Sequence, residues 1–284
     1  MTVRTVFTVA VLTLREAARR RVMLAVGAMT AALLGLSAWG FSRLDVELAA
    51  LTTGEARLVS AQVLNLVMFG FSLIAALGTA FLSGPTMAGE IESGTALAIL
   101  ARPIRRPAVL LGKWLGLVVF GAVCVAAAGL AEFLIMWSTL DYWPPQAATG
   151  LALLVTQTTV LLTLALLLST VISPMASGIV AVGLFGATWI AGVIGGMGQA
   201  VSNEGVARVG TVSRILLPTD GLWRGAMNAF QDPVALARFG GPAVRGGFPF
   251  LSPAPLTGTY LAWTVVWIAL VFCLAAVAFA RRDL

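Results

Sequence analysis

The hydrophobic positions of the chain form six long apolar runs separated by shorter polar stretches. These runs cover 22–41, 63–84, 108–136, 149–172, 175–198 and 259–280. A hydrocarbon core about 30 Å thick needs about 20 apolar residues in a helix. Because lipid offers no partner to open backbone groups, each run is expected to be helical. The pattern predicts an all-α integral membrane fold with six transmembrane helices in one domain over 1–284.

Residues 1–21 predict a further helix that lies in the membrane interface. Six residues at helical spacing form one apolar face, while arginines occupy the other side and would meet anionic headgroups. The six are Val3, Val6, Phe7, Ala10, Val11 and Leu14. A frayed cytoplasmic tail is the alternative. The run that follows is long and shows no small-residue cleavage site, so a retained anchor is expected rather than a signal peptide.

The polar segment after the second run predicts a short helix outside the membrane. Ser93 can cap a helix over 94–101, and Arg102 before Pro103 ends it. This helix is too short to span a bilayer. Its ridge of Leu97, Ile99 and Leu100 is flanked by carboxylates before and guanidinium groups after, which suits insertion into a groove on a partner.

The 60-residue stretch 199–258 is expected to be an extracytoplasmic loop with two helix signatures. Thr219 or Asp220 can cap the first helix, whose apolar face would lie on the membrane or the bundle. Asp232, followed by Pro233, can cap the second. Small residues four apart in three of the runs predict close helix packing. These are Gly27, Ala31 and Gly35, Gly112 and Gly116, and Gly192 and Gly196.

The composition, 59% hydrophobic and 11% charged, is typical of a membrane protein. The net charge is +6, but the basic residues do not form a stripe with interleaved aromatics, so no nucleic-acid partner is expected. The basic residues instead predict cytoplasmic termini and a cytoplasmic 89–113 segment, since they cluster there. They are Arg4, Arg15, Arg19, Arg20, Arg21, Arg102, Arg105, Arg106, Lys113, Arg281 and Arg282. Tryptophans near the run ends, including Trp223 and Trp267, predict aromatic belts.

Several kinds of chemistry have no residues to support them. The chain has no histidine, and its two cysteines, Cys124 and Cys273, lie within apolar runs, so neither a metal site nor a His-dependent nucleophile is expected. The sequence contains no GxxxxGK[ST] motif to cradle a nucleotide. We therefore expect a non-catalytic protein that binds no cofactor and does not itself hydrolyse ATP.

Glu132 is the one carboxylate well inside an apolar run, and Gln157 is expected at a similar depth. A buried ionisable group in a membrane suggests a function or a partner. Glu132 and Gln157 are therefore candidates for a polar patch on a substrate pathway, facing a cleft. A Glu that is satisfied by a neighbouring helix is the other interpretation, and both remain open.

Residues 90–113 follow the pattern E-x-E-S-G-T-x-x-x-x-L-x-R-P-x-x-R-x-x-x-x-x-G-K and resemble the permeases of type-2 ABC exporters. The resemblance extends over the whole chain. It implies a coupling helix within 89–107 that docks on ABC ATPase subunits. The residues implied in that contact are Glu90, Glu92, Gly94, Thr95, Leu97, Leu100, Arg102, Pro103 and Arg106. One departure is the uncharged segment STVISPMASG (169–178), where relatives carry several charges.

The segment LLPTDGLWRGAMNAF (216–230) is similar to the branch that includes the nitrous-oxide-reductase maturation transporter permease. The matching positions are Pro218, Thr219, Asp220 and Arg224. This resemblance implies half of an ATP-driven exporter, completed by a second copy or a homologue, with the bilayer and possibly an extracytoplasmic protein as further partners. Two alternatives remain open: a membrane scaffold that relays ATPase motion to an extracytoplasmic partner, and a secondary transporter.

Overall fold

The computed structural model describes residues 2–48, 51–84, 86, 89, 106–241 and 248–281, with the backbone alone at 2, 45–47 and 106. All regular elements in these ranges are helices, and six of them are long and apolar enough to cross a membrane. The six are α2 (Arg21–Leu48), α3 (Thr53–Gly84), α6 (Arg106–Leu140), α7 (Ala147–Val171), α8 (Pro174–Ala200) and α13 (Gly258–Arg281). The predicted all-α membrane fold is confirmed, and the protein is a multi-pass membrane protein.

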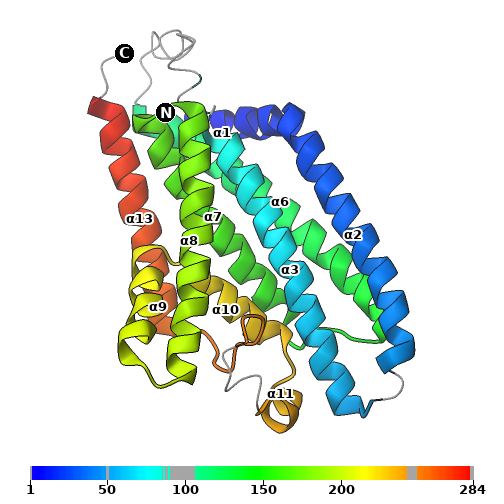
Figure 1. Cartoon of the computed structure of the whole chain (residues 1–284). Coiled ribbons are helices and arrows are strands. Elements are labelled where there is room, and N and C mark those ends of the chain that lie inside the picture. Colours follow the sequence, from blue (N-terminus) through cyan, green and yellow to red (C-terminus); the bar gives the residue numbers. More distant parts are fainter. Residues whose placement is uncertain are drawn as a thin grey trace.

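Four shorter helices complete the described fold: α1 (Thr2–Arg19), α9 (Glu204–Leu216), α10 (Thr219–Phe230) and α11 (Pro233–Phe239). The spans alternate in direction, so α3 ends and α6 begins at the end of the bundle where α1 lies (Figure 1). The C-terminal end of α13 lies there too. Helices α9, α10 and α11 lie at the opposite end (Figure 1). We call these the α1 end and the α10 end.

Helix α3 begins ten residues earlier than the apolar run that predicts it. Thr52 and Glu55 explain this start: the Thr52 hydroxyl donates to Glu55 Oε2 at 2.7 Å, and the backbone N–H of Thr52 donates to the same oxygen at 3.1 Å. Such bonds stabilise a helix N-terminus and do not require apolar residues in the first turns, so the helix can begin before the apolar run. Arg57, expected in a loop, therefore lies on α3.

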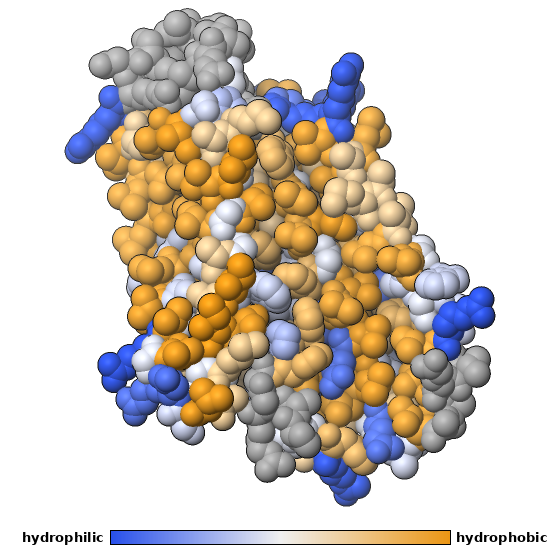
Figure 2. Space-filling model, in the orientation of Figure 1, coloured by the Kyte–Doolittle hydropathy of each residue, from blue (hydrophilic) through white to orange (hydrophobic). Residues whose placement is uncertain are grey.

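Helices α3 and α7 form the centre of the bundle, and α2 lies at its edge. More than half of the most apolar 18-residue window is buried in α3 and α7, against 6% in α2. The core combines side chains of α3, α6, α7 and α10, among them Leu64, Met68, Phe133 and Leu154. Figure 2 shows a surface that is mostly apolar across its middle and hydrophilic toward its two ends.

The small residues pack against the short helices more than against neighbouring spans. A side chain at Gly112 or Gly116 of α6 would overlap α1, and one at Gly192 of α8 would overlap α10, whereas Gly196 has only one side chain of α10 within 4 Å. Gly27 and Gly35 of α2, in contrast, have no atom of the described chain within 4 Å of where a Cβ would be. The expected close packing is thus present on α6 and α8 and absent, within the described residues, on α2.

Candidate functional site

Helix α10 is buried inside the α10 end of the bundle. It packs against α7, α8 and α3, and ten of its residues are buried. Gly150 of α7 leaves the space that the Phe230 ring fills. Trp223 is 1% exposed and Trp267 is 8% exposed, so the predicted aromatic belt is wrong for both. The 199–258 region is therefore part of the core and not only a surface loop.

Asp220 does not cap α10, and neither does Thr219; both predictions are wrong. Pro218 is the N-cap residue, and no side chain caps this end. The buried carboxylate of Asp220 instead accepts hydrogen bonds from Nε of Arg214 at 2.8 Å and Nε of Arg224 at 3.0 Å. Because the helix begins after Pro218, Asp220 lies inside its first turn, where its carboxylate reaches the two guanidinium groups instead.

The ion-paired cluster of Asp220, Arg214 and Arg224 also joins α10 to α8. Arg224 Nη2 donates to the backbone carbonyl of Gly192 at 2.7 Å. Asp220 lies directly against Gly192, where no Cβ would fit. The predicted motif residues Asp220 and Arg224 are thus brought together, and they hold α9, α10 and α8 in one arrangement.

Gln157 lies at the centre of a second polar cluster, which we call the four-helix junction. Its Oε1 accepts from the hydroxyl of Ser72 at 2.8 Å, and its Nε2 donates to the carbonyl of Thr219 at 3.2 Å. The hydroxyl groups of Thr219 and Thr188 lie 2.9 Å apart. Residues from α3, α7, α8 and α10 are therefore hydrogen-bonded at one buried place.

Glu132 lies apart from this junction and has different partners. It is 0% exposed on α6, and its Oε2 accepts from the hydroxyl of Ser37 on α2 at 2.8 Å. Its Oε1 has no hydrogen-bond partner among the described residues. The structure does not place Glu132 and Gln157 in one polar patch, because both side chains are buried and each bonds to different helices. Their role on a substrate pathway stays a prediction.

Polar contacts also fix the end of α10 and the segment between α11 and α13. The Tyr142 hydroxyl donates to the carbonyl of Phe230 at 2.6 Å, and Asn65 of α3 donates to the carbonyl of Phe250 at 3.0 Å. Burial raises the pKa of Tyr142 above its usual range, and the nearby Asp232 raises it further, while Arg57 lowers it. Asp232 caps α11 as predicted, accepting from the backbone N–H groups of Val234 and Ala235.

The family model described as "ABC-2 family transporter protein" matches residues 7–284. The chain belongs to the ABC-2 transporter family. It is accordingly a permease component of ABC transporters, which implies an ABC ATPase partner. A search of curated protein sequences gives no significant match to the permease.

The predicted ATPase-coupling residues of the permease lie almost entirely outside the described residues. These are Glu90, Glu92, Gly94, Thr95, Leu97, Leu100, Arg102 and Pro103, while Arg106 is the first residue of α6 and only its backbone is described. Their contact with an ATPase stays a prediction. The described residues on both sides do show how the segment is attached to the bundle.

Two contacts fix the helices that flank this segment. Lys113, which the sequence places in a polar loop, is a buried residue of α6 whose Nζ donates to the carbonyl of Thr86 at 2.6 Å. Gly84, the last residue of α3, packs against the backbone of Pro174 at the start of α8. The uncharged turn between α7 and α8 is thus in direct contact with the end of α3.

Helix α9 is the element of the permease that the sequence did not predict. Its residues EGVARVGTVSRIL include two glycines and several β-branched residues of low helix propensity. Asn203 caps it by accepting from the N–H of Val206, and Gly195 of α8 meets Gly210 of α9 backbone to backbone. The glycines of α8 that face α9 could have indicated this helix, because small residues in membrane helices allow another helix to approach closely.

The last turn of α9 supplies the acceptors for three residues of α13. The hydroxyl of Tyr260 donates to the carbonyl of Arg214. The indole N–H of Trp263 donates to the carbonyl of Ile215, and that of Trp267 donates to the carbonyl of Leu216. These bonds satisfy helix-end carbonyls that have no partner within α9. Groups of three or more potential metal ligands from His, Cys, Asp and Glu are absent from the described part of the permease.

Proposed function

We propose that this permease is half of an ATP-driven exporter in the inner membrane, with its α1 end and both termini in the cytoplasm. Separate ATPase subunits would bind ATP and Mg²⁺ and dock on the coupling helix within 89–107. A second copy or a homologue would complete the pathway, since six spans with one coupling helix make half a transporter.

The four-helix junction is the observation that carries this proposal. Helix α3 leads directly into the coupling segment at one end of the bundle. In its middle, Ser72 bonds to Gln157, which bonds to Thr219 of α10. A displacement of α3 therefore strains hydrogen bonds that hold α10 in the core at the opposite end. Such a buried network with discrete partners suits alternation between two arrangements.

The attachment of the coupling segment supports the same proposal. Lys113 ties the start of α6 to the backbone just beyond α3, and Gly84 packs on the turn before α8. A force applied between residues 85 and 105 would reach α3, α6 and the α7–α8 turn together. The segment 169–178 carries no charges. This fits a turn that moves with α3 because it packs against it, and not a turn that makes a second polar contact with the ATPase.

A photoreactive residue at Leu97 in native membranes tests the ATPase contact. It should form an adduct with an ABC ATPase, whereas the same group at Val123, which is 61% exposed on the apolar surface of α6, should not. Leu97→Asp together with Leu100→Asp should abolish ATPase binding and ATP-driven activity. If this double variant keeps the ATPase bound and active, the coupling helix is assigned wrongly.

Gln157→Leu tests the transmission step separately. It should leave the ATPase bound while ATP hydrolysis no longer drives the conformational change at the α10 end, measured by labelling of single cysteines there. Thr156→Val is the matched control, because Thr156 lies next to Gln157 on α7, is partly exposed and bonds only within its own helix. Equal coupling in both variants would contradict a role for the junction.

One observation favours the scaffold that relays motion to an extracytoplasmic partner. A hollow of about 530 Å³, lined by charged and apolar side chains, lies at the α10 end between the start of α3 and α11, where Arg57 and Asp232 are ion-paired at 3.3 Å. The similarity of 216–230 to the nitrous-oxide-reductase maturation branch supports a partner on this side. Arg238→Glu with Val234→Glu on α11 would abolish binding of such a partner, and would leave a simple exporter active.

A further inference from the structure

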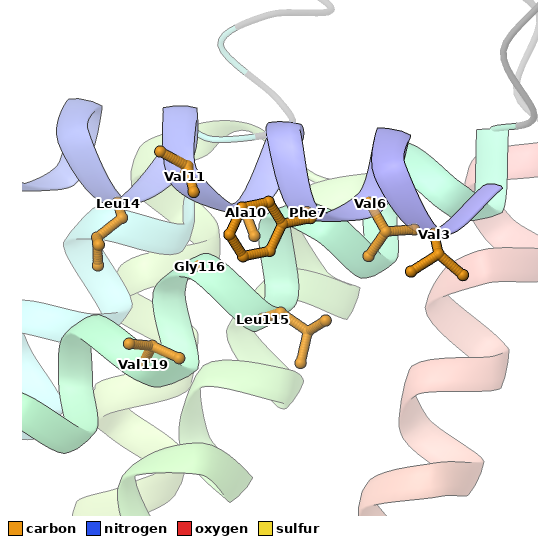
Figure 3. Close-up of a pocket in the computed structure, with 9 residues that line it drawn as sticks. All are labelled: Val3, Val6, Phe7, Ala10, Val11, Leu14, Leu115, Gly116 and Val119. Atoms are coloured by element: carbon orange, nitrogen blue, oxygen red, sulfur yellow. The ribbon is translucent and has the colours of Figure 1, made fainter. Parts of the chain in front are cut away.

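The apolar face of α1 does not pack fully against the protein but covers an open groove. All six residues predicted for that face line it, together with Leu115, Gly116 and Val119 of α6 (Figure 3). The groove has a volume of about 430 Å³. Phe7 is 69% exposed and Val119 is 49% exposed, so the groove opens to the side of the bundle.

Only hydrocarbon suits this groove. Its lining consists of aliphatic and aromatic side chains and one glycine, and an apolar space of this kind stays dry. A water-sized group takes about 30 Å³, so the volume has room for about fourteen such groups. In a multi-pass membrane protein the side of the bundle faces acyl chains. One acyl chain is the matching occupant in size and polarity.

Arg4 and Arg15, predicted on the other side of α1, lie beside the edge of its apolar face, next to the groove residue Val11. Arg4 and Arg15 are seven residues before and four residues after Val11, which places all three on one side of α1. Both guanidinium groups are exposed, and neither pairs with a carboxylate in the described ranges, whereas Arg20, just after the helix, pairs with Glu16. Positive charge without a protein partner at a membrane surface complements a lipid phosphate.

We propose that the α1–α6 groove binds an anionic phospholipid, with one acyl chain between the two helices and the phosphate at Arg4 and Arg15. Gly116 makes the site possible, because a side chain there would overlap the backbone carbonyl of Ala10 and lift α1 off α6. The lipid would cover the part of the apolar face of α1 that does not pack on the protein.

Native mass spectrometry of the purified permease tests the site without any ATPase. Phosphatidylglycerol should be retained more strongly than phosphatidylcholine with identical acyl chains. Arg4→Gln together with Arg15→Gln should remove this preference. Each arginine is expected to contribute a factor of about five to the retention of phosphatidylglycerol over phosphatidylcholine, which corresponds to about 1 kcal/mol. Arg43→Gln, an exposed arginine at the α10 end of α2, is the control and should leave the preference intact.

Val119→Trp should fill the groove and lower retention of both lipids severalfold. Val123→Trp is the matched control, since Val123 is exposed one turn further along α6 and does not line the groove. Equal retention in these two variants, or an unchanged preference in the double arginine variant, overturns the proposal. So does a photoreactive group at position 119 that captures a protein segment or a second copy instead of lipid.

Discussion

The carboxyl group of Asp220 on α10 occupies the space beside Gly192 on α8 that a side chain would otherwise take. The same carboxylate holds Arg224, whose Nη2 bonds to the Gly192 carbonyl at 2.7 Å. Small residues in membrane helices usually admit a second backbone. Here the glycine admits an ion-paired carboxylate, so this helix contact depends on charge as well as on size.

Gly192→Ala should destabilise the permease by about 1 to 3 kcal/mol, because the added methyl group overlaps the Asp220 carboxylate in a closely packed place. Thermal unfolding in detergent measures the effect. Gly183→Ala on the same helix is the control, since nothing lies within 4 Å of its Cβ position. Equal midpoints for the two variants would contradict this packing.

Asp220→Ala should cost about 3 to 5 kcal/mol, because it leaves two partly buried guanidinium groups without their shared carboxylate. Asp220→Asn should fall between Asp220→Ala and the unmodified protein, as its amide oxygen still accepts one hydrogen bond. Asp141→Asn, at an exposed position, should have little effect. Chemical denaturation of all three variants gives the comparison, and an Asp220→Ala protein of normal stability would show that the cluster does not hold α10.

Glu132→Gln should change stability by less than about 1 kcal/mol, because an amide oxygen can accept the Ser37 hydrogen bond in place of the carboxylate. A role in the substrate pathway predicts that this variant alters the dependence of ATP-driven activity on external pH. Ser37→Ala separates the hydrogen bond from the carboxyl group and should keep that dependence. Normal activity of Glu132→Gln at every external pH would remove Glu132 from the pathway.

Tyr142→Phe should lower stability by about 1 to 3 kcal/mol at neutral pH, because the carbonyl of Phe230 loses its donor. Folding raises the pKa of this phenol, so the folded state favours the protonated form. The stabilisation is therefore complete below the unfolded pKa of about 10 and is lost as the pH rises above it. Unfolding measured from neutral to alkaline pH should show a shallower decline for the variant; an identical decline would contradict the assignment.

Gly116→Ala should loosen α1, because the added methyl group overlaps the carbonyl of Ala10. The exposed arginines of α1 should then be cleaved faster by trypsin in membranes. Gly27→Ala on α2, where the added methyl group meets no described atom, is the control and should leave the cleavage rate unchanged.

The six spans were predictable because a bilayer sets a minimum length for an apolar helix. The position of α10 was not, since Leu222, Ala226 and Phe230 form an apolar face that suits lipid and protein core equally well. Asp220 looked like a cap because Asp at a helix start usually is one. Its partner Arg214 lies on α9, a helix that was not predicted because its residues have low helix propensity. The Asp220–Arg214 ion pair therefore depends on the turn between α9 and α10, which the sequence pattern does not reveal.

The long separation between Asn65 and Phe250, 185 residues apart along the chain, has a consequence for biogenesis. Until residue 250 has been translated, the buried amide of Asn65 on α3 sits in the bilayer without its acceptor. Five spans (α2, α3, α6, α7 and α8) are therefore part of an unfinished assembly until translation nears its end. A nascent chain stopped after residue 216 should be degraded rapidly in the membrane, whereas one stopped after residue 258 should persist.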